Sequence, residues 1–202
     1  MVSDPLRPSK VALIKLLSEK AYMRSEEPFQ LASGAWSHDY IDCRRAMALG
    51  ADLGVVAAAV VEQALASGVA LMEKHSENQA IEVQAIGGLT MGADPISHAV
   101  ALVTGLSWFS VRKNVKSHGA KRTIEGAQIE SGTKVMVVDD VVTSGSSIID
   151  AIDSVIQSGG DVVLAMALLD RSYATGKAME AMDIPYVAIT TFEDLGIEPV
   201  EI

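Results

Sequence analysis

From residue 82 onward the chain repeats short, continuous apolar runs separated by longer segments. The runs are residues 83–86, 107–111, 135–138, 162–169 and 186–190. A strand with one solvent-exposed face alternates apolar and polar residues. A continuous apolar run is typical of a strand that is covered on both faces, as in a parallel sheet. The pattern predicts an α/β fold of three layers, with a central, mostly parallel sheet flanked by helices.

Helix-length segments fill most gaps between these runs, at about residues 94–104, 145–158 and 174–182. A loop is expected instead over residues 112–131. The chain is 202 residues long, which is the size of one domain with a small appendage.

The part of the chain before the sheet has a different pattern. Apolar residues at helical spacing predict an amphipathic first helix, and its expected buried face is Val11, Ile14, Leu17 and Ala21. Residues 29–45 alternate and turn, so a short hairpin is expected there. A helix is expected over residues 51–74, with a pause at Gly68.

Composition argues against several classes of protein. The formal net charge of -10 disfavours non-specific nucleic-acid binding and attachment to an anionic membrane. Cys43 is the single cysteine, so an internal disulfide is excluded and a reducing, cytoplasmic location is expected. No secretory signal is expected, and the most hydrophobic run, residues 53–61, is far shorter than the roughly 20 residues of a membrane span.

The stretch KVMVVDDVVTSGSSIIDAI, residues 134–152, carries the most chemistry. Asp139 and Asp140 follow an apolar run, so we expect them at the carboxyl edge of the sheet, where open α/β sheets bind ligands. The small residues after them open a helix near Gly145, and free backbone N–H groups at a helix start bind phosphate. Paired acids suit sugar hydroxyls or a divalent metal. The whole string therefore predicts a site for a ribose 5-phosphate.

Two other interpretations of this stretch are weaker. Asp and Ser are ordinary helix-capping residues, but capping accounts for single residues and not for the whole string. The chain contains no GxxxxGK[ST] motif, so the phosphate loop of nucleotide triphosphatases is excluded.

The string resembles the signature of type I phosphoribosyltransferases, which bind 5-phosphoribosyl 1-diphosphate (PRPP). The resemblance implies that the acids contact the ribose hydroxyls and that the loop holds the 5′-phosphate. The implied PRPP-binding residues are Asp139, Asp140, Val141, Val142, Thr143, Ser144, Gly145, Ser146 and Ser147.

A second segment, VRKNVKSHGAKRTIEG (111–126), concentrates five of the 16 basic residues. A charge run is usually a solvated loop, but a cationic loop in an acidic protein suits an anionic ligand. The segment resembles the catalytic loop of orotate phosphoribosyltransferases, which closes over pyrophosphate and reaches partly into the neighbouring subunit's site. The resemblance implies a homodimer, and the implied catalytic and PRPP-binding residues are Arg112, Lys113, Lys116 and His118, with Asp139 and Asp140.

Two further strand ends fit the same family. The segment AIGGLTMGADPIS (85–97) has two interpretations. It is either a plain strand-to-helix turn or, by resemblance, the pyrophosphate loop with Thr90, Met91 and Gly92. Met91 stands where Lys is common in the family. Arg171 follows the run 162–169 and is expected at the same edge as Asp140. The resemblance implies that Arg171 and Thr143 bind orotate, since a guanidinium pairs well with its carboxylate. A structural ion pair is the alternative for Arg171.

The segment FQLASGAWSHDYIDCRR (29–45) resembles the family's segment over the base, with Ala32 where Lys often stands. The implied organisation is a single domain, 1–202, in which about 1–45 form an N-terminal helix and hood over the base site and about 46–202 form the core.

Together, the resemblances of these segments imply Mg²⁺-dependent transfer of phosphoribosyl from PRPP to orotate, giving orotidine 5′-phosphate and diphosphate in pyrimidine biosynthesis. Mg²⁺ is expected to be held mainly through the substrate, with Asp139 and Asp140 as candidate ligands. Two alternatives stay open at this point: a phosphoribosyltransferase for another base, such as a purine, and a non-catalytic regulator that binds PRPP. No nucleic-acid or membrane partner is expected.

Overall fold

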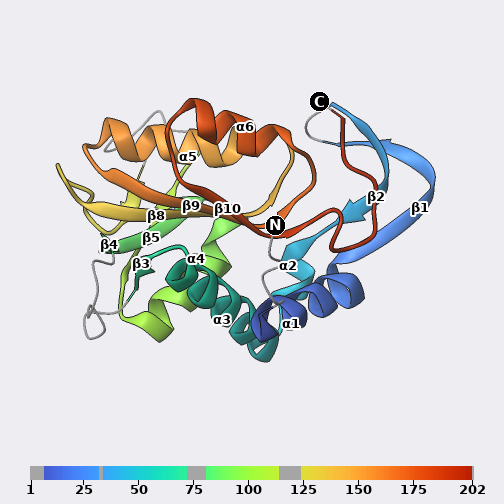
Figure 1. Ribbon diagram of the computed structural model, residues 1–202, viewed down its shortest axis with the longest axis horizontal. Helices are drawn as coiled ribbons and strands as arrows, with labels where there is room; N and C mark the ends of the chain where they lie inside the picture. Colours follow the sequence, from blue (N-terminus) through green and yellow to red (C-terminus); the bar gives the residue numbers. More distant parts are fainter. Residues whose placement is uncertain (1–6, 32–33, 72–80, 114–123, 202) are drawn as a thin grey trace.

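The computed structural model describes residues 7–31, 34–71, 81–113 and 124–201. A six-stranded sheet of order β10-β9-β8-β5-β6-β7 forms its centre (Figure 1). Its strands are β5 (Ala85–Leu89), β6 (Ser107–Val111), β7 (Ile124–Gly126), β8 (Lys134–Val142), β9 (Asp161–Asp170) and β10 (Tyr186–Thr191). All neighbours pair in parallel except β7, which is antiparallel to β6. The predicted fold class is confirmed.

Helices cover both faces of this sheet (Figure 1). One face carries α1 (Pro8–Leu16), α3 (Gly50–Ala66) and α4 (Ala93–Thr104), and the other carries α5 (Ser146–Gln157) and α6 (Ala174–Ala181). Met136 and Val138 of β8 are buried in the first core, whereas Val135 and Val137 are buried in the second. Burial on both faces is the reason that this strand is continuously apolar. Within the described residues, no helix is long and apolar enough to cross a membrane.

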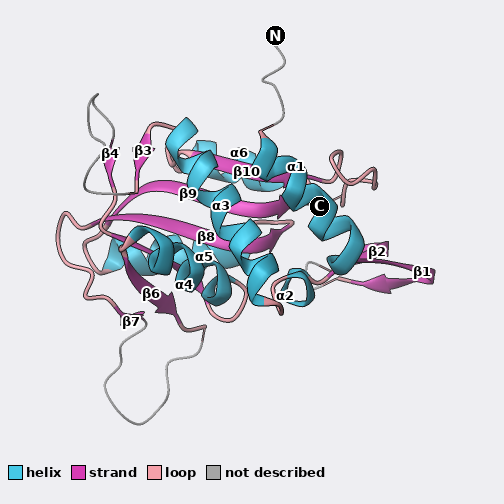
Figure 2. Ribbon diagram, turned by 90° about the horizontal axis from the view of Figure 1, so that it is seen from below, coloured by secondary structure: helices cyan, strands magenta, loops and turns pink. Residues whose placement is uncertain are grey.

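Two small sheets and two short helical segments complete the described chain. β1 (Tyr22–Gln30) and β2 (Trp36–Ile41) form an antiparallel hairpin at one end of the molecule (Figure 2). The π-helix η1 (Leu17–Ala21) leads into it and α2 (Cys43–Ala46) follows it. β3 (Val69–Ala70) and β4 (Ile81–Glu82) form a two-residue parallel ladder. The predicted hairpin therefore exists, but it begins earlier in the chain than expected.

The predicted buried face of the first helix is partly wrong. Leu13, Leu16, Leu17 and Ala21 are buried, whereas Val11 is 49% exposed. Both sets of residues recur at helical spacing, so periodicity alone does not choose between them. In the fold, Leu13, Leu16 and Leu17 pack into the core. The π-helical turn over Leu17–Ala21 then shifts which face of the helix is buried at the end of the segment.

Three other predicted boundaries need correction. The helix expected over 51–74 ends at Ala66. It ends there because Gly68 adopts a left-handed backbone conformation with φ +78°. Residues 72–80 lie outside the described part. The strand expected over 83–86 is β5, so Gly87 and Gly88 lie inside a strand and not in a turn. The loop expected over 112–131 contains β7.

The positions of Gly87 and Gly88 are explained by close backbone contacts. A Cβ on Gly87 would lie 2.2 Å from the carbonyl oxygen of Phe109 on β6. A Cβ on Gly88 would lie 2.1 Å from the carbonyl oxygen of Val138 on β8. Only glycine fits between these neighbours, so β5 approaches both strands more closely than a side chain allows.

The sheet opens at the carboxyl end of β8. β8 pairs with β5 only as far as Val137, but with β9 as far as Val142. The chain runs from β5 through α4 to β6 on one side, and from β8 through α5 to β9 on the other. The gap between β5 and β8 is therefore the topological switch point, where α/β sheets bind ligands.

Gly88→Ala should lower the free energy of unfolding by about 1–3 kcal/mol, because its methyl group must displace backbone. The matched control is Gly54→Ala in α3, where a Cβ meets nothing within 4 Å. That control should be neutral or stabilising by up to about 1 kcal/mol, since Ala is the better helix former. Urea denaturation measures both, and equal stability of the two variants would contradict the close packing of β5.

Candidate functional site

Asp139 and Asp140 lie in the last part of β8, which runs four residues beyond the expected end at 138 because β9 continues to pair with it. Asp139 is 4% exposed. Its Oδ1 accepts a hydrogen bond from the backbone N–H of Asp140 (3.0 Å), and Oδ1 of Asp140 accepts one from Val141 (2.9 Å). Oδ2 of Asp139 is buried and has no hydrogen-bond partner among the described residues.

Burial sets the electrostatics of this pair. It raises the pKa of Asp139 to about 8, with the negative charge of Asp140 as the second cause. Burial also raises the pKa of Asp140, against hydrogen bonds from the backbone that lower it. A buried carboxylate oxygen without a donor is costly, so this position favours a proton, a hydroxyl donor or a cation.

The predicted pyrophosphate loop lies directly against these acids. A Cβ on Gly92 would lie 2.4 Å from Oδ1 of Asp140 and 3.2 Å from Oδ1 of Asp139. The peptide bond between Thr90 and Met91 is cis, and the Met91 side chain is 65% exposed. Two segments that are far apart in sequence therefore meet at the switch point.

The predicted phosphate loop opens α5 as expected. Gly145 is the N-cap residue with φ +77° and has no side chain to cap the helix, while the N–H of Ser146 donates to Ser144 Oγ (3.4 Å). Ser144 Oγ donates a hydrogen bond to Ser146 Oγ (3.3 Å). The Thr143 carbonyl accepts hydrogen bonds from the hydroxyls of Ser172 and Thr175, which tie the loop to the turn after β9.

Val141 and Val142 belong to strand β8 and not to the loop. Val142 is buried in one core and Val141 packs partly buried against the other. Their side chains therefore serve the core, which leaves only their backbone for a ligand.

Arg171 emerges beside this site from the end of β9. It is 2% exposed, and its Nη2 donates a hydrogen bond to Ser37 Oγ of β2 (3.1 Å). Its Nε has no partner among the described residues, and no described carboxylate forms a salt bridge with it. Burial lowers the pKa of Arg171, against the charge of Asp39, which raises it. The structural ion pair considered as the alternative is thus not found in the described chain.

The hairpin and α2 reach the same edge. Asp39 of β2 accepts hydrogen bonds from the Tyr22 hydroxyl (2.8 Å) and from Arg24 (3.2 Å). Cys43 of α2 is fully buried, as expected for a small apolar residue, and its thiol lies 3.9 Å from the Asp140 carbonyl oxygen. Burial raises the pKa of the Cys43 thiol well above its ordinary value, so it stays neutral. Nothing in the sequence indicated this contact with the acids.

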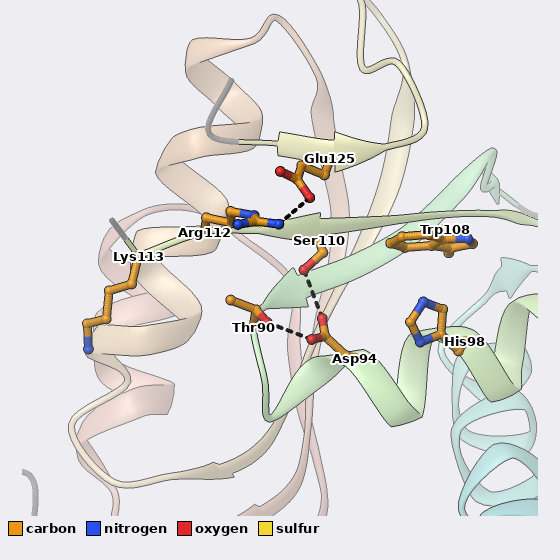
Figure 3. Close-up of a pocket in the computed structure, with 8 residues that line it drawn as sticks. All are labelled: Thr90, Asp94, His98, Trp108, Ser110, Arg112, Lys113 and Glu125. Carbon is orange, nitrogen blue, oxygen red and sulfur yellow. Dashed lines mark hydrogen bonds and ion pairs between the residues drawn. The ribbon is translucent and has the colours of Figure 1, made fainter. Parts of the chain in front are cut away.

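Only the two ends of the basic segment 111–126 are described. Lys116, His118 and the rest of residues 114–123 lie outside the described part, as does Ala32. Arg112 forms an ion pair with Glu125 of β7 (2.8 Å), and the Lys113 side chain extends away from it (Figure 3). Together they border a pocket of about 490 Å³ whose other lining residues are Thr90, Asp94, His98, Trp108 and Ser110. Asp94 belongs to the segment predicted as the pyrophosphate loop, whereas the sequence did not indicate His98, Trp108 or Ser110.

The acids fit a metal held largely by substrate. The described residues contain no group of three or more His, Cys, Asp or Glu side chains arranged to hold an ion. Asp139 and Asp140 offer the hard oxygen ligands that Mg²⁺ prefers, one of them an orphaned buried atom. Mg²⁺ commonly uses one or two carboxylates together with substrate oxygens, and this pair suits that arrangement.

Comparisons with known proteins place the chain among enzymes. No protein-family model matches it. It is 32% identical to the orotate phosphoribosyltransferase of Rhodopirellula baltica over 98% of this chain and all of that protein. It is also 32% identical to that of Corynebacterium glutamicum (strain R), over 94% of this chain and 95% of the relative.

Solved structures agree with these relatives. A phosphoribosyltransferase from Corynebacterium diphtheriae matches with a TM-score of 0.75 and 28% identity, over 95% of this chain and all of that one. The Mycobacterium tuberculosis H37Rv orotate phosphoribosyltransferase in complex with PRPP matches with a TM-score of 0.72 and 28% identity, over 94% of this chain and all of that one.

Asp139→Asn tests the cost of the buried charge. The pKa of Asp139 rises from 3.8 to about 8 on folding, so the folded state binds the proton more tightly and wild-type stability falls as pH rises through this window. Asn carries no such proton. The free energy of unfolding of Asp139→Asn, relative to wild type, should therefore increase by about 1–3 kcal/mol from pH 5 to pH 8 in urea denaturation.

The control for this experiment is Asp153→Asn on the exposed side of α5. The difference in stability between this variant and wild type is the baseline for the Asp139→Asn difference over the same pH range. An Asp139→Asn difference that does not change with pH would contradict the buried charge.

Proposed function

This chain belongs to the orotate phosphoribosyltransferase family, and on that premise we propose how its own residues carry out the reaction. The enzyme transfers phosphoribosyl from PRPP to orotate, giving orotidine 5′-phosphate and diphosphate in pyrimidine biosynthesis. The observation that carries the assignment of the base is the buried guanidinium of Arg171. It lies at the same sheet edge as the acids and lacks a carboxylate partner among the described residues. The carboxylate of orotate supplies that partner.

The sugar and its phosphate occupy the end of β8 in this proposal. Asp139 and Asp140 accept hydrogen bonds from the ribose hydroxyls, and this role is supported by Oδ2 of Asp139, which no described residue satisfies. The 5′-phosphate binds the loop Thr143–Ser147, where the N-terminal N–H groups of α5 and small hydroxyls converge. The relative from M. tuberculosis was solved with PRPP, which supports the same ligand here.

The base lies between Arg171 and the hairpin. Ser37 of β2 touches the Arg171 guanidinium, so the hairpin reaches over the carboxylate site. This contact supports the organisation expected from the sequence, a hood of about residues 1–45 over a core of about 46–202. Thr143 is the second proposed orotate contact, because its carbonyl is fixed beside Ser172, next to Arg171.

In the reaction, the bond from the anomeric carbon to the pyrophosphate oxygen breaks, a bond to a ring nitrogen of orotate forms, and that nitrogen releases its proton. The leaving diphosphate gains negative charge, which cationic side chains in a site shielded from water stabilise strongly. We assign this role to Arg112, Lys113, Lys116 and His118, beside Thr90–Gly92. Asp139 and Asp140 would hold Mg²⁺ with the substrate, and a bound Mg²⁺ stabilises charge on the diphosphate.

We also propose a homodimer in the cytoplasm. Large apolar side chains are exposed on the α4–β6 side of the molecule: Met91, Leu102, Val103 and Trp108. Strand β6 leads directly into Arg112, where the basic loop begins. A second copy that covers this face brings its own basic loop close to the neighbouring site, so the proposed occupant of the face is the same chain.

Arg171→Gln should lower kcat/KM for orotate by about 100-fold or more, because the carboxylate loses a bidentate, buried partner. KM for PRPP should change little, since Arg171 contacts the base and not the sugar. The control is Arg24→Gln, an exposed arginine of the hairpin that pairs with Asp39. An equal loss toward both substrates, or none, in steady-state assays would contradict the assignment.

Mixing two inactive variants tests whether the loop is shared. Lys116→Ala and Asp140→Asn should each lower turnover by about 100- to 1000-fold. If Lys116 acts in the partner's site, a mixed dimer contains one intact site, and refolding an equal mixture should restore about a quarter of wild-type activity. Lys121→Ala, in the same loop, is the control for loop charge and should stay active. No restored activity on mixing would place Lys116 in its own chain's site.

A further inference from the structure

Asp94 stands in the first turn of α4 with both carboxylate oxygens occupied. Its Oδ2 accepts a hydrogen bond from the Thr90 hydroxyl at 2.6 Å, and its Oδ1 accepts one from the Ser110 hydroxyl at 2.8 Å. Figure 3 shows the side chain directed away from its own helix, toward the loop on one side and β6 on the other. One carboxylate thus connects three elements: the loop after β5, the start of α4, and β6.

These hydrogen bonds close a ring at the end of β6. The backbone N–H of Thr90 donates to the carbonyl of Val111 (2.9 Å), so Thr90 is held by its backbone as well as by Asp94. Ser110 and Val111 are the last residues of β6, and Arg112 follows them. The ring therefore sets the position of the loop relative to the strand that starts the basic loop.

An ordinary capping role does not account for this arrangement. An acidic residue in a first turn usually accepts hydrogen bonds from backbone N–H groups of its own helix or interacts with the helix dipole. No side chain caps α4, and both Asp94 oxygens bond to hydroxyls of other elements. The hydrogen bonds therefore contribute to the register between loop and strand more than to the helix end.

The position of the loop matters because Gly92 leaves no free space beside the acids. Its backbone lies so close to Asp140 that even a methyl group would overlap the carboxylate. A shift of the loop thus moves the surface that faces the ribose and diphosphate. Misplacing a reacting group by about 1 Å is enough to cost about 100-fold in rate.

We propose that Asp94 is a positioning residue for PRPP, which holds the loop Thr90–Gly92 in register with the end of β6. This inference rests on the proposed function and adds a residue that does not itself touch substrate. It predicts a selective defect toward PRPP, because the proposed orotate contacts, Arg171 and Thr143, lie after β9 and β8 and not on the elements that Asp94 connects.

Steady-state kinetics and calorimetry of PRPP binding test the proposal on full-length variants. Asp94→Ala should lower kcat/KM for PRPP by about 10- to 100-fold and leave KM for orotate within about twofold of wild type. Asp94→Asn should recover much of the loss, because an amide both accepts and donates, and each hydroxyl can do either. Ser110→Ala should show a smaller defect, and Ser107→Ala, at the other end of β6, should show none.

The double variant decides whether the ring acts as a unit. Asp94→Ala/Ser110→Ala should be no worse than Asp94→Ala alone, because the shared hydrogen bond is already lost. Additive losses, an equal rise in both KM values, or unchanged PRPP kinetics would overturn the role of Asp94. If wild type binds PRPP but does not use orotate, the proposed function fails, and the binding affinities of the variants still decide this inference. If wild type does not bind PRPP, both fail.

Discussion

The site depends on the close approach of β5 and its following loop to their neighbours. Gly87 lies against β6, Gly88 against β8, and Gly92 against the two acids, and each lacks room for a Cβ. These contacts bring the end of β5 beside Asp139 and Asp140 at the point where β5 and β8 stop pairing. The same contacts leave little room for the loop Thr90–Gly92 to move. We therefore propose a role in positioning this loop for Asp94, although Asp94 is far from the acids in sequence.

Two buried groups that lack complete partners among the described residues have opposite requirements. In that part of the chain, Oδ2 of Asp139 meets no donor and Nε–H of Arg171 meets no acceptor. Unsatisfied buried polar atoms are costly in a folded protein, and at a ligand site the ligand satisfies them. A sugar hydroxyl or a cation suits the first, and a carboxylate suits the second. PRPP and orotate together provide both.

Most of the sheet could be predicted because burial on both faces leaves continuous apolar runs, as at residues 135–138. The acids and Arg171 could be placed at one edge because parallel strands end there together. The sequence predicts a turn at Gly87 and Gly88, where the structure has a strand. Glycine in a sequence usually indicates a turn, but it also permits close contact between strands. Cys43 beside Asp140 and Ser110 beside Asp94 could not be predicted, since tertiary packing brings these pairs together without a local pattern.

The most direct measurement is a spectrophotometric assay of base consumption by the wild-type protein with PRPP and Mg²⁺, run in parallel with orotate, uracil, adenine and hypoxanthine. The account predicts turnover of orotate alone, because only orotate brings a carboxylate to Arg171. Turnover of uracil or a purine at a comparable rate would contradict the base assignment while keeping the PRPP site. Tight PRPP binding without turnover of any base would contradict the proposed catalysis itself.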